Sequence, residues 1–207
     1  METLEANSTR LQDAPARSHL LEATRAAHAR LESILPLASP QLTLREYSNV
    51  LRTFLSIYTV LEAQIELHGP ELARWDVDWP RRRKLPLLLR DAEALAAMAP
   101  AVWPAPSPDA VLRLLTPSHA MGCLYVLEGA TLGGKVIARN VRRVLGLGPD
   151  NGASFFDSYG SAAATSWQAF CAALERCLPD EASRAQAADA ATATFRLFAE
   201  RLAHQAA

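Results

Sequence analysis

The sequence predicts an all-α protein that folds as one domain. Alanine is abundant, runs of β-branched residues are scarce, and no stretch alternates polar and apolar residues as a half-buried strand would. The 207 residues fit one domain or at most two, and a hydrophobic content of 50% is enough to bury a core. We expect residues 1–15 to form a flexible leader and residues 16–207 to form a single helical domain.

Charge and cysteine content narrow the class of protein further. The 21 Lys and Arg residues balance 22 Asp and Glu residues, so no overall field attracts nucleic acid or an acidic membrane. Three cysteines argue against a disulfide framework and for a reducing compartment. No apolar stretch resembles a signal peptide or approaches the ~18 residues of a membrane span. We expect a cytoplasmic protein that binds neither nucleic acid nor membrane.

The first two predicted helices are amphipathic. Apolar residues recur at steps of three and four from Ala16 to Leu35, with His28 in the middle of the stripe. A lone histidine in such a place is usually a hydrogen-bonded core residue. Arg25 lies one turn earlier, so a cation could flank whatever His28 contacts. A second helix begins with the capping box Thr43 to Glu46 and stops at Gly69-Pro70.

The middle of the chain is less regular. An irregular joint at residues 75–80 leads into the basic run Arg81, Arg82, Arg83 and Lys84, and a helix through Leu85 to Met98 follows. A basic run is usually a solvated face, and the alternative is a docking patch for an acidic protein. Residues 100–108 read as a surface loop. Ser107-Pro108 then resembles the start of a short helix to Leu115.

The most informative stretch runs from Ser118 to Gly146 and is predicted to be a helix with Ser118 as its cap. It contains Gly122, Gly129, Gly133 and Gly134. Four interior glycines cost about 4 kcal/mol relative to alanine, a large share of the ~5–15 kcal/mol that stabilises a domain. Gly129 and Gly133 share a face, which lets a helix or a flat ligand approach the backbone. Judged from the glycine spacing alone, another helix packed against this face is favoured over a ligand. Gly133-Gly134 is a natural place for a bend.

The rest of the chain adds two helices and removes several classes of function. A loop at residues 146–160 precedes helices predicted at Ala162 to Leu178 and Glu181 to His204. The sequence contains no phosphate loop, dinucleotide fingerprint, nucleophile elbow, zinc spacing or Glu-x-x-His pair. One well-placed histidine, a glycine-opened helix and scattered cations suit a large planar anionic cofactor better than a metal ion held by several side chains.

Three motifs occur in a fixed order along the chain. TRAAHARLE spans residues 24–32, LYVLEGATLGG spans residues 124–134, and FFDSYG at residues 155–160 is followed by Trp167 and Phe170. Together they resemble the bacterial heme oxygenases, especially those that accompany bacteriophytochromes. The resemblance spans about residues 18–202, and the glycine motif is its most specific part.

This resemblance implies a heme-oxygenase-like bundle with a glycine-bent distal helix. Heme would lie between the first helix, whose His28 binds the iron on the proximal side, and the glycine helix on the distal side. Gly129 and Gly133 would make room for heme and O2, and Gly134 would help the bend. An imidazole ligand promotes O–O cleavage less than a thiolate does. A wall of backbone also offers few acid–base groups, so the porphyrin's own meso carbon is attacked.

The resemblance also implies the partners of the reaction. Heme is both cofactor and substrate, the products are biliverdin, CO and ferrous iron, and a reductase or ferredoxin supplies electrons. Arg25, Lys135 and Arg139 are candidates for binding the heme propionates. Arg142 and Arg143, together with the basic run at residues 81–84, could dock the electron donor. The bilin would supply the chromophore of a bacteriophytochrome.

Ala130 is a departure from the pattern of the mammalian-type enzymes, which carry a carboxylate after the first distal glycine. Glu128 precedes Gly129 and is expected to point away from the site. No residue is therefore assigned to deliver protons to bound oxygen. Two alternatives therefore remain. One is a non-catalytic heme- or bilin-binding carrier, and the other is a helical protein of the same fold that acts on another small molecule, as the thiamine-degrading relatives do.

Overall fold

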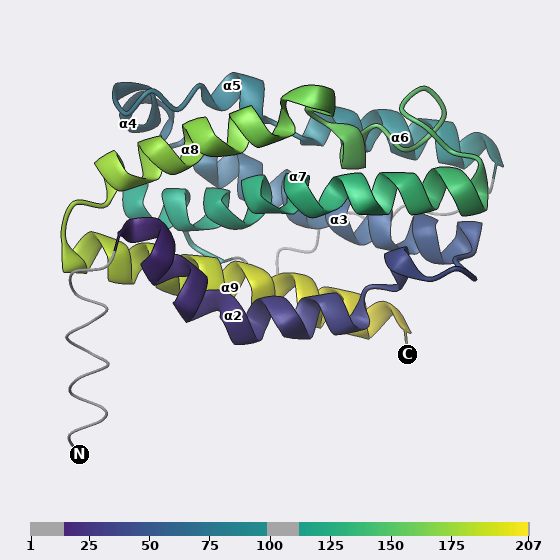
Figure 1. Ribbon diagram of the computed structural model, residues 1–207, viewed down its shortest axis with the longest axis horizontal. Coiled ribbons are helices and arrows are strands. Elements are labelled where there is room, and N and C mark those ends of the chain that lie inside the picture. Colours follow the sequence, from purple (N-terminus) through teal and green to yellow (C-terminus); the bar gives the residue numbers. More distant parts are fainter. Residues whose placement is uncertain (1–14, 99–111, 207) are drawn as a thin grey trace, which may run out of the picture.

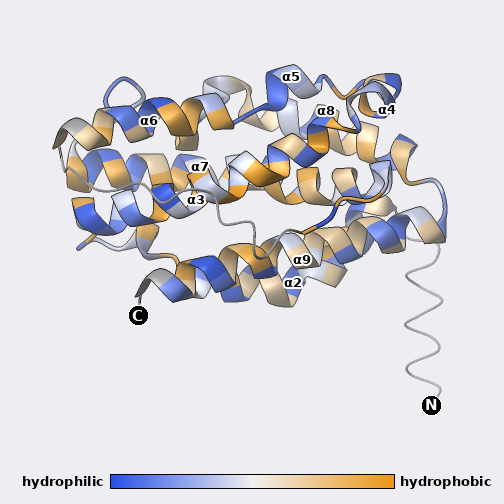
Figure 2. Ribbon diagram, turned by 180° about the vertical axis from the view of Figure 1, so that it is seen from behind, coloured by the Kyte–Doolittle hydropathy of each residue, from blue (hydrophilic) through white to orange (hydrophobic). Residues whose placement is uncertain are grey.

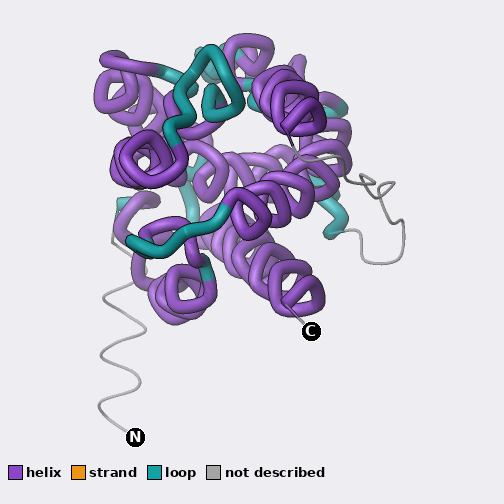
Figure 3. The backbone as a smooth tube through the Cα atoms, turned by 90° about the vertical axis from the view of Figure 1, so that its right-hand side faces the viewer, coloured by secondary structure: helices purple, strands orange, loops and turns teal. Residues whose placement is uncertain are grey.

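The protein is a bundle of α-helices. The structure is a computed structural model that describes residues 15–98 and 112–206, and within those residues the regular structure is helical, with no strand (Figures 1 and 3). The all-α prediction is confirmed. The helices are α2 (Ala16–Ile34), α3 (Leu44–Glu66), α4 (Gly69–Arg74), α5 (Trp79–Arg82), α6 (Leu85–Met98), α7 (Pro117–Leu145), α8 (Ala163–Cys177) and α9 (Glu181–Ala206), with 3₁₀ turns η1 (Pro36–Ala38), η3 (Phe155–Asp157) and η4 (Gly160–Ala162).

Helix α9 is the centre of the lower half of the bundle in Figure 1. Both α2 and α7 pack along it, and α7 also packs against α8 and η3. Hydrophobic and hydrophilic residues alternate along the helices, which is the pattern of amphipathic helices around a shared core (Figure 2). The core includes the fully buried Leu20, Leu61, Ile65, Phe170 and Leu174. None of the described helices is both long and apolar enough to cross a membrane.

Local capping fixes where helices α3 and α7 begin. The capping box before α3 is present, with the Glu46 amide donating to Thr43 Oγ1 at 3.2 Å and the Thr43 amide donating to the Glu46 carboxylate at 2.8 Å. Helix α7 begins at Pro117 and is capped by Thr116, not by Ser118 as expected, because Pro117 suits the first turn of a helix. It ends at Gly146, whose φ of +70° favours glycine.

The structure shows different ends for several of the predicted helices. The predicted leader lies outside the described residues, apart from Pro15 at its end. Most of the short helix expected before Leu115 is also outside them, and residues 112–115 are not helical. The second helix ends at Glu66, and Gly69 begins the short α4 instead of ending a long helix.

Helix α7 runs unbroken through its four glycines. A Cβ on Gly122 would lie 2.0 Å from the Ala187 carbonyl oxygen of α9, which confirms close helix packing there. A Cβ on Gly134 would lie 2.7 Å from the Phe156 carbonyl oxygen, so this glycine admits the backbone of η3. The glycines do not break the helix, and a bend within the continuous helix stays a prediction.

Candidate functional site

A cavity of about 360 Å³ opens between α2 and α7. Residues of α3, α8, α9 and the η3 turn complete its walls, and its volume falls in the range of small-molecule sites. Most of the lining is apolar and aromatic, including Leu31, Phe54, Phe156, Trp167, Phe195 and Phe198. A cavity of this kind takes a ligand with a large apolar surface.

The α2 wall carries the histidine. His28 lines the cavity with 53% of its side chain exposed, and the edge of its ring meets Phe195 of α9 at a centroid distance of 5.2 Å. Its Nδ1 lies 3.7 Å from a carboxylate oxygen of Glu32, one turn later. Nε2 has no hydrogen-bond partner among the described residues. A carboxylate behind one ring nitrogen is the usual arrangement for a histidine that binds a metal through the other.

The α7 wall combines side chains such as Tyr125, Leu132 and Ile137 with bare backbone at its glycines. Gly129, Ala130, Gly133 and Gly134 all line the cavity. A Cβ on Gly129 would meet only Trp167, at 3.6 Å, and a Cβ on Gly133 would meet nothing within 4 Å. Gly133 therefore faces open space and Gly129 has room for a Cβ beside Trp167, whereas Gly134 packs against backbone. Glu128, as expected, is not among the lining residues.

Of the three cations predicted to bind the heme propionates, one lines the cavity and two do not. Arg25 lines the cavity and forms an ion pair with Glu22, whereas Lys135 and Arg139 lie on α7 outside the lining. Sequence reasoning missed Arg17, which also lines the cavity and whose guanidinium makes no hydrogen bond or ion pair within the described part of the chain. The spacing of Arg17, Leu21, Thr24 and His28 at steps of four, three and four is the signal that could have revealed it.

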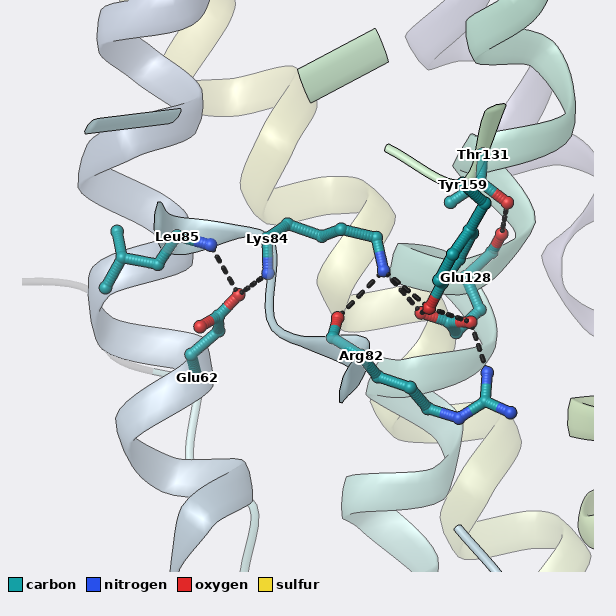
Figure 4. Close-up of polar contacts among 7 residues, drawn as sticks. All are labelled: Glu62, Arg82, Lys84, Leu85, Glu128, Thr131 and Tyr159. Atoms are coloured by element: carbon teal, nitrogen blue, oxygen red, sulfur yellow. Dashed lines mark hydrogen bonds and ion pairs between the residues drawn. The ribbon is translucent and has the colours of Figure 1, made fainter. Parts of the chain in front are cut away.

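One cavity residue, Lys84, belongs to a buried polar cluster that we call the Glu128 cluster: Glu128, Arg82, Lys84 and Tyr159 (Figure 4). Glu128 is 1% exposed and forms ion pairs with Arg82 and Lys84. The Lys84 ammonium donates to Glu128 at 2.9 Å and to the Tyr159 hydroxyl at 2.8 Å, and that hydroxyl donates to Glu128. Burial lowers the pKa of Lys84, and the Glu128 carboxylate opposes that effect.

The cluster corrects the expectation that residues 81–84 form a solvated or docking surface. The side chains of Arg82 and Lys84 are only 11% and 3% exposed, because the buried Glu128 needs cations beside it. Arg83 is half-exposed and pairs with the buried Glu62. Arg81 is the exposed member of the run. Arg142 and Arg143 are exposed, as predicted.

The aromatic floor of the cavity is fixed by a buried carboxylate. Asp91 of α6 accepts hydrogen bonds from the Ser154 amide at 2.8 Å, the Ser154 hydroxyl at 2.7 Å and the Phe155 amide at 2.8 Å. The η3 turn thereby presents Phe155 and Phe156, whose rings pack edge-to-face with each other, and Phe155 also packs edge-to-face with Phe54. Sequence reasoning placed these aromatic residues in a loop without identifying their anchor.

The residues fit a large planar ligand whose metal takes one nitrogen from the protein. The described residues contain no group of three or more His, Cys, Asp or Glu side chains that could hold a bare metal ion, and the described thiols are free. One imidazole on α2, bare backbone on α7 and two arginines on α2 instead suit a flat, apolar, anionic ligand whose metal needs one protein ligand. Heme has these properties.

Comparison with known proteins identifies the family of the chain. The heme oxygenase family model matches residues 14–204. A heme oxygenase from Xanthomonas campestris is 36% identical over 129 residues, which cover 62% of this chain and 72% of that protein.

Solved heme oxygenases share the fold. The enzyme from Leptospira interrogans aligns with a TM-score of 0.76 at 18% identity, covering 92% of this chain and 100% of that one. The NO- and CO-bound enzyme from Neisseria meningitidis gives 0.77 at 18% identity, with 92% and 91% covered. The Synechocystis heme oxygenase-1 in complex with heme gives 0.71 at 13% identity, with 92% of each chain covered. Because the family model spans nearly the whole sequence, the chain belongs to the heme oxygenase family of heme-degrading oxygenases.

Proposed function

We propose that this chain cleaves heme to biliverdin, CO and ferrous iron, using O2 and electrons from a separate reductase or ferredoxin in the cytoplasm. The observation that carries the proposal is that His28 of α2 and the bare backbone of Gly129 and Gly133 of α7 line one cavity. An iron ligand on one helix and space for a planar ring on another are what heme binding requires.

The residues of the α2 wall hold the substrate. His28 would hold the iron through Nε2, while the Glu32 carboxylate lies 3.7 Å from Nδ1 and the perpendicular contact with Phe195 restricts rotation of the imidazole. Heme itself supplies the iron at which O2 is activated and the carbon that is oxidised. The aromatic and aliphatic lining excludes water from the reacting face. Gly129 and Gly133 themselves contribute no acid–base side chain to that face.

Heme binding tests the proposal directly. The purified chain mixed with hemin should show a Soret band and should yield a bilin with ascorbate or a reductase. In His28→Ala the Soret band should be lost or shifted, and added imidazole should restore it. His204→Ala is the matched control, because His204 lies on α9 outside the cavity lining. A heme complex that never yields a bilin would favour a carrier, and failure to bind hemin would indicate another small molecule.

The propionates of heme are assigned to Arg17 and Arg25. Guanidinium groups bind carboxylates strongly, and both arginines line the cavity on the helix that carries His28. Arg17→Met should weaken the binding of hemin while leaving the binding of hemin dimethyl ester unchanged, because the ester carries no carboxylate. Equal weakening of both ligands would show that Arg17 contributes only apolar contact. Lys135→Met and Arg139→Met are controls outside the cavity.

Two partner proteins follow from the proposed reaction, one that takes up the product and one that supplies electrons. The motif resemblance favours a bilin that becomes the chromophore of a bacteriophytochrome, and attachment of the product to an apo-photoreceptor tests this. With Arg82 and Lys84 buried, Arg142 and Arg143 become the candidate donor-docking cations. Arg142→Glu should slow turnover with a protein donor and leave turnover with ascorbate unchanged, because ascorbate needs no docking surface.

A further inference from the structure

The Glu128 cluster holds more positive than negative charge. It contains one carboxylate, Glu128, and two cations, Arg82 and Lys84, so its net charge is +1. The neighbouring Glu62 is matched separately, because its ion pair is with Arg83 and it accepts hydrogen bonds from the Lys84 and Leu85 amides. Buried charges are costly unless paired, so a cluster with one unmatched cation calls for a reason.

Lys84 connects the cluster to the cavity. Its side chain is 3% exposed and nevertheless lines the cavity, next to residues of α7 and the η3 turn. Its ammonium donates to Glu128 Oε1 at 2.9 Å, to the Tyr159 hydroxyl at 2.8 Å and to the Arg82 carbonyl oxygen at 2.8 Å (Figure 4). All three ammonium hydrogens are therefore used, and the cation is fixed in the wall.

The other charged residues of the cavity lie on a different wall. Arg17, Arg25 and Glu32 all belong to α2, the helix of His28. The α7 stretch from Gly129 to Gly134 carries no charged residue. Among the described lining residues, Lys84 is therefore the charged group that does not come from the His28 helix.

We propose that Lys84 sets the electrostatic potential on the side of the cavity opposite His28, and that Glu128 and Tyr159 hold it in place and limit its strength. The inference rests on the proposed function, because it concerns the face of heme that His28 does not occupy. The incoming electrons bring negative charge into a cavity with a largely apolar lining, where a fixed cation stabilises that charge without reorganising. Glu128 keeps the field moderate by neutralising one of the two cations.

Anion binding to the ferric heme complex tests the proposal. Glu128→Gln raises the cluster's net charge to +2, Lys84→Met lowers it to 0, and the double variant returns it to +1. A unit charge roughly 10 Å away, at an effective dielectric constant of about 20, changes an anion's affinity on the order of tenfold. Azide should therefore bind about tenfold more tightly to Glu128→Gln and about tenfold more weakly to Lys84→Met. The double variant should resemble the native chain.

Neutral imidazole is the matched ligand, because it occupies the same face without charge. Its affinity should change much less than that of azide in both single variants. Arg81→Met is the matched variant, since this cation is 87% exposed and three residues from Lys84. It should leave both affinities unchanged, and thermal unfolding of each heme-free variant measures any loss of fold. If Glu128→Gln does not fold, Lys84→Met and the double variant still carry the comparison.

The outcomes separate this inference from the proposed function. Azide and imidazole affinities that change by the same factor would show a merely structural clamp, and unchanged azide affinity in Lys84→Met would also overturn the inference. Either result leaves heme binding by His28 intact. Failure of the native chain to bind hemin overturns the proposed function and this inference together.

Discussion

Gly133→Ala should make the heme-free protein more stable and its heme site worse. A Cβ at Gly133 meets nothing within 4 Å, so alanine fits without any neighbour moving. Alanine in a helix interior is favoured over glycine by about 1 kcal/mol. For a domain of this size, that difference raises the unfolding temperature by roughly 2–4 °C. Because Gly133 lines the cavity, the added methyl group should obstruct a ligand on the distal face of heme.

The assay has two arms that should move in opposite directions. Urea unfolding of the heme-free chain should give a larger free energy of unfolding for Gly133→Ala than for the native chain. CO binding to its ferrous heme complex should be weaker, while the affinity for hemin changes less because the His28 bond is unaltered. Gly134→Ala is the matched control. Its Cβ would lie 2.7 Å from the Phe156 carbonyl oxygen, so it should lose about 1–3 kcal/mol of stability.

Loss of stability in heme-free Gly133→Ala would refute this reasoning, because it would mean that the position is packed and not open. Unchanged CO binding would refute the second step, because Gly133 would then not face the ligand. A gain in stability with weaker CO binding is the combination that only a functional glycine produces.

Three further predictions follow from groups behind the cavity walls. Asp91→Asn should lower the free energy of unfolding by about 2–4 kcal/mol in urea titration, because one amide cannot replace a carboxylate that accepts three hydrogen bonds; a loss under 0.5 kcal/mol would contradict this anchoring role. Burial raises the pKa of Cys123 to about 12 and raises the pKa of Tyr47, so both groups ionise first in the unfolded chain. The stability that their protonation provides is complete below about pH 9 and falls between about pH 9 and 12, by up to about 1.4 kcal/mol per pH unit for each group, so a flat unfolding temperature over that range would count against it. Iodoacetamide at pH 8 should label the half-buried Cys171 before Cys123 in the native chain, as peptide mass mapping can show.

Features encoded by neighbouring residues could be predicted from the sequence. The capping box at Thr43 and Glu46, the glycine end of α7 at Gly146 and the stripe of α2 each depend on residues within one or two turns. The cap of α7 is harder to predict, because Thr116 and Ser118 both suit the capping position and the choice between them depends on Pro117. Local chemistry therefore fixes the elements well and their exact ends less well.

Features encoded by distant pairs could not be predicted. The basic run at residues 81–84 looked like a solvated surface because its partner, Glu128, lies more than 40 residues later. The reverse also holds, because a buried glutamate in an apolar helix gives no indication of which cations it will meet. Lys135 and Arg139 follow the glycines closely in sequence, yet neither is among the residues that line the cavity.

The four glycines of α7 now separate into two pairs with different physical causes. Gly122 and Gly134 are required by the fold, because a Cβ at either position would overlap a backbone carbonyl. Gly129 and Gly133 have no such constraint. In the heme-free chain, no packing contact therefore offsets the roughly 2 kcal/mol of stability that these two glycines lose relative to alanine. A ligand that binds the folded chain at about 30 times its dissociation constant contributes about 2 kcal/mol of stability. Bound heme at that level would offset the cost of both open glycines, so these glycines are compatible with a stable protein when substrate is present and weaken it when substrate is absent.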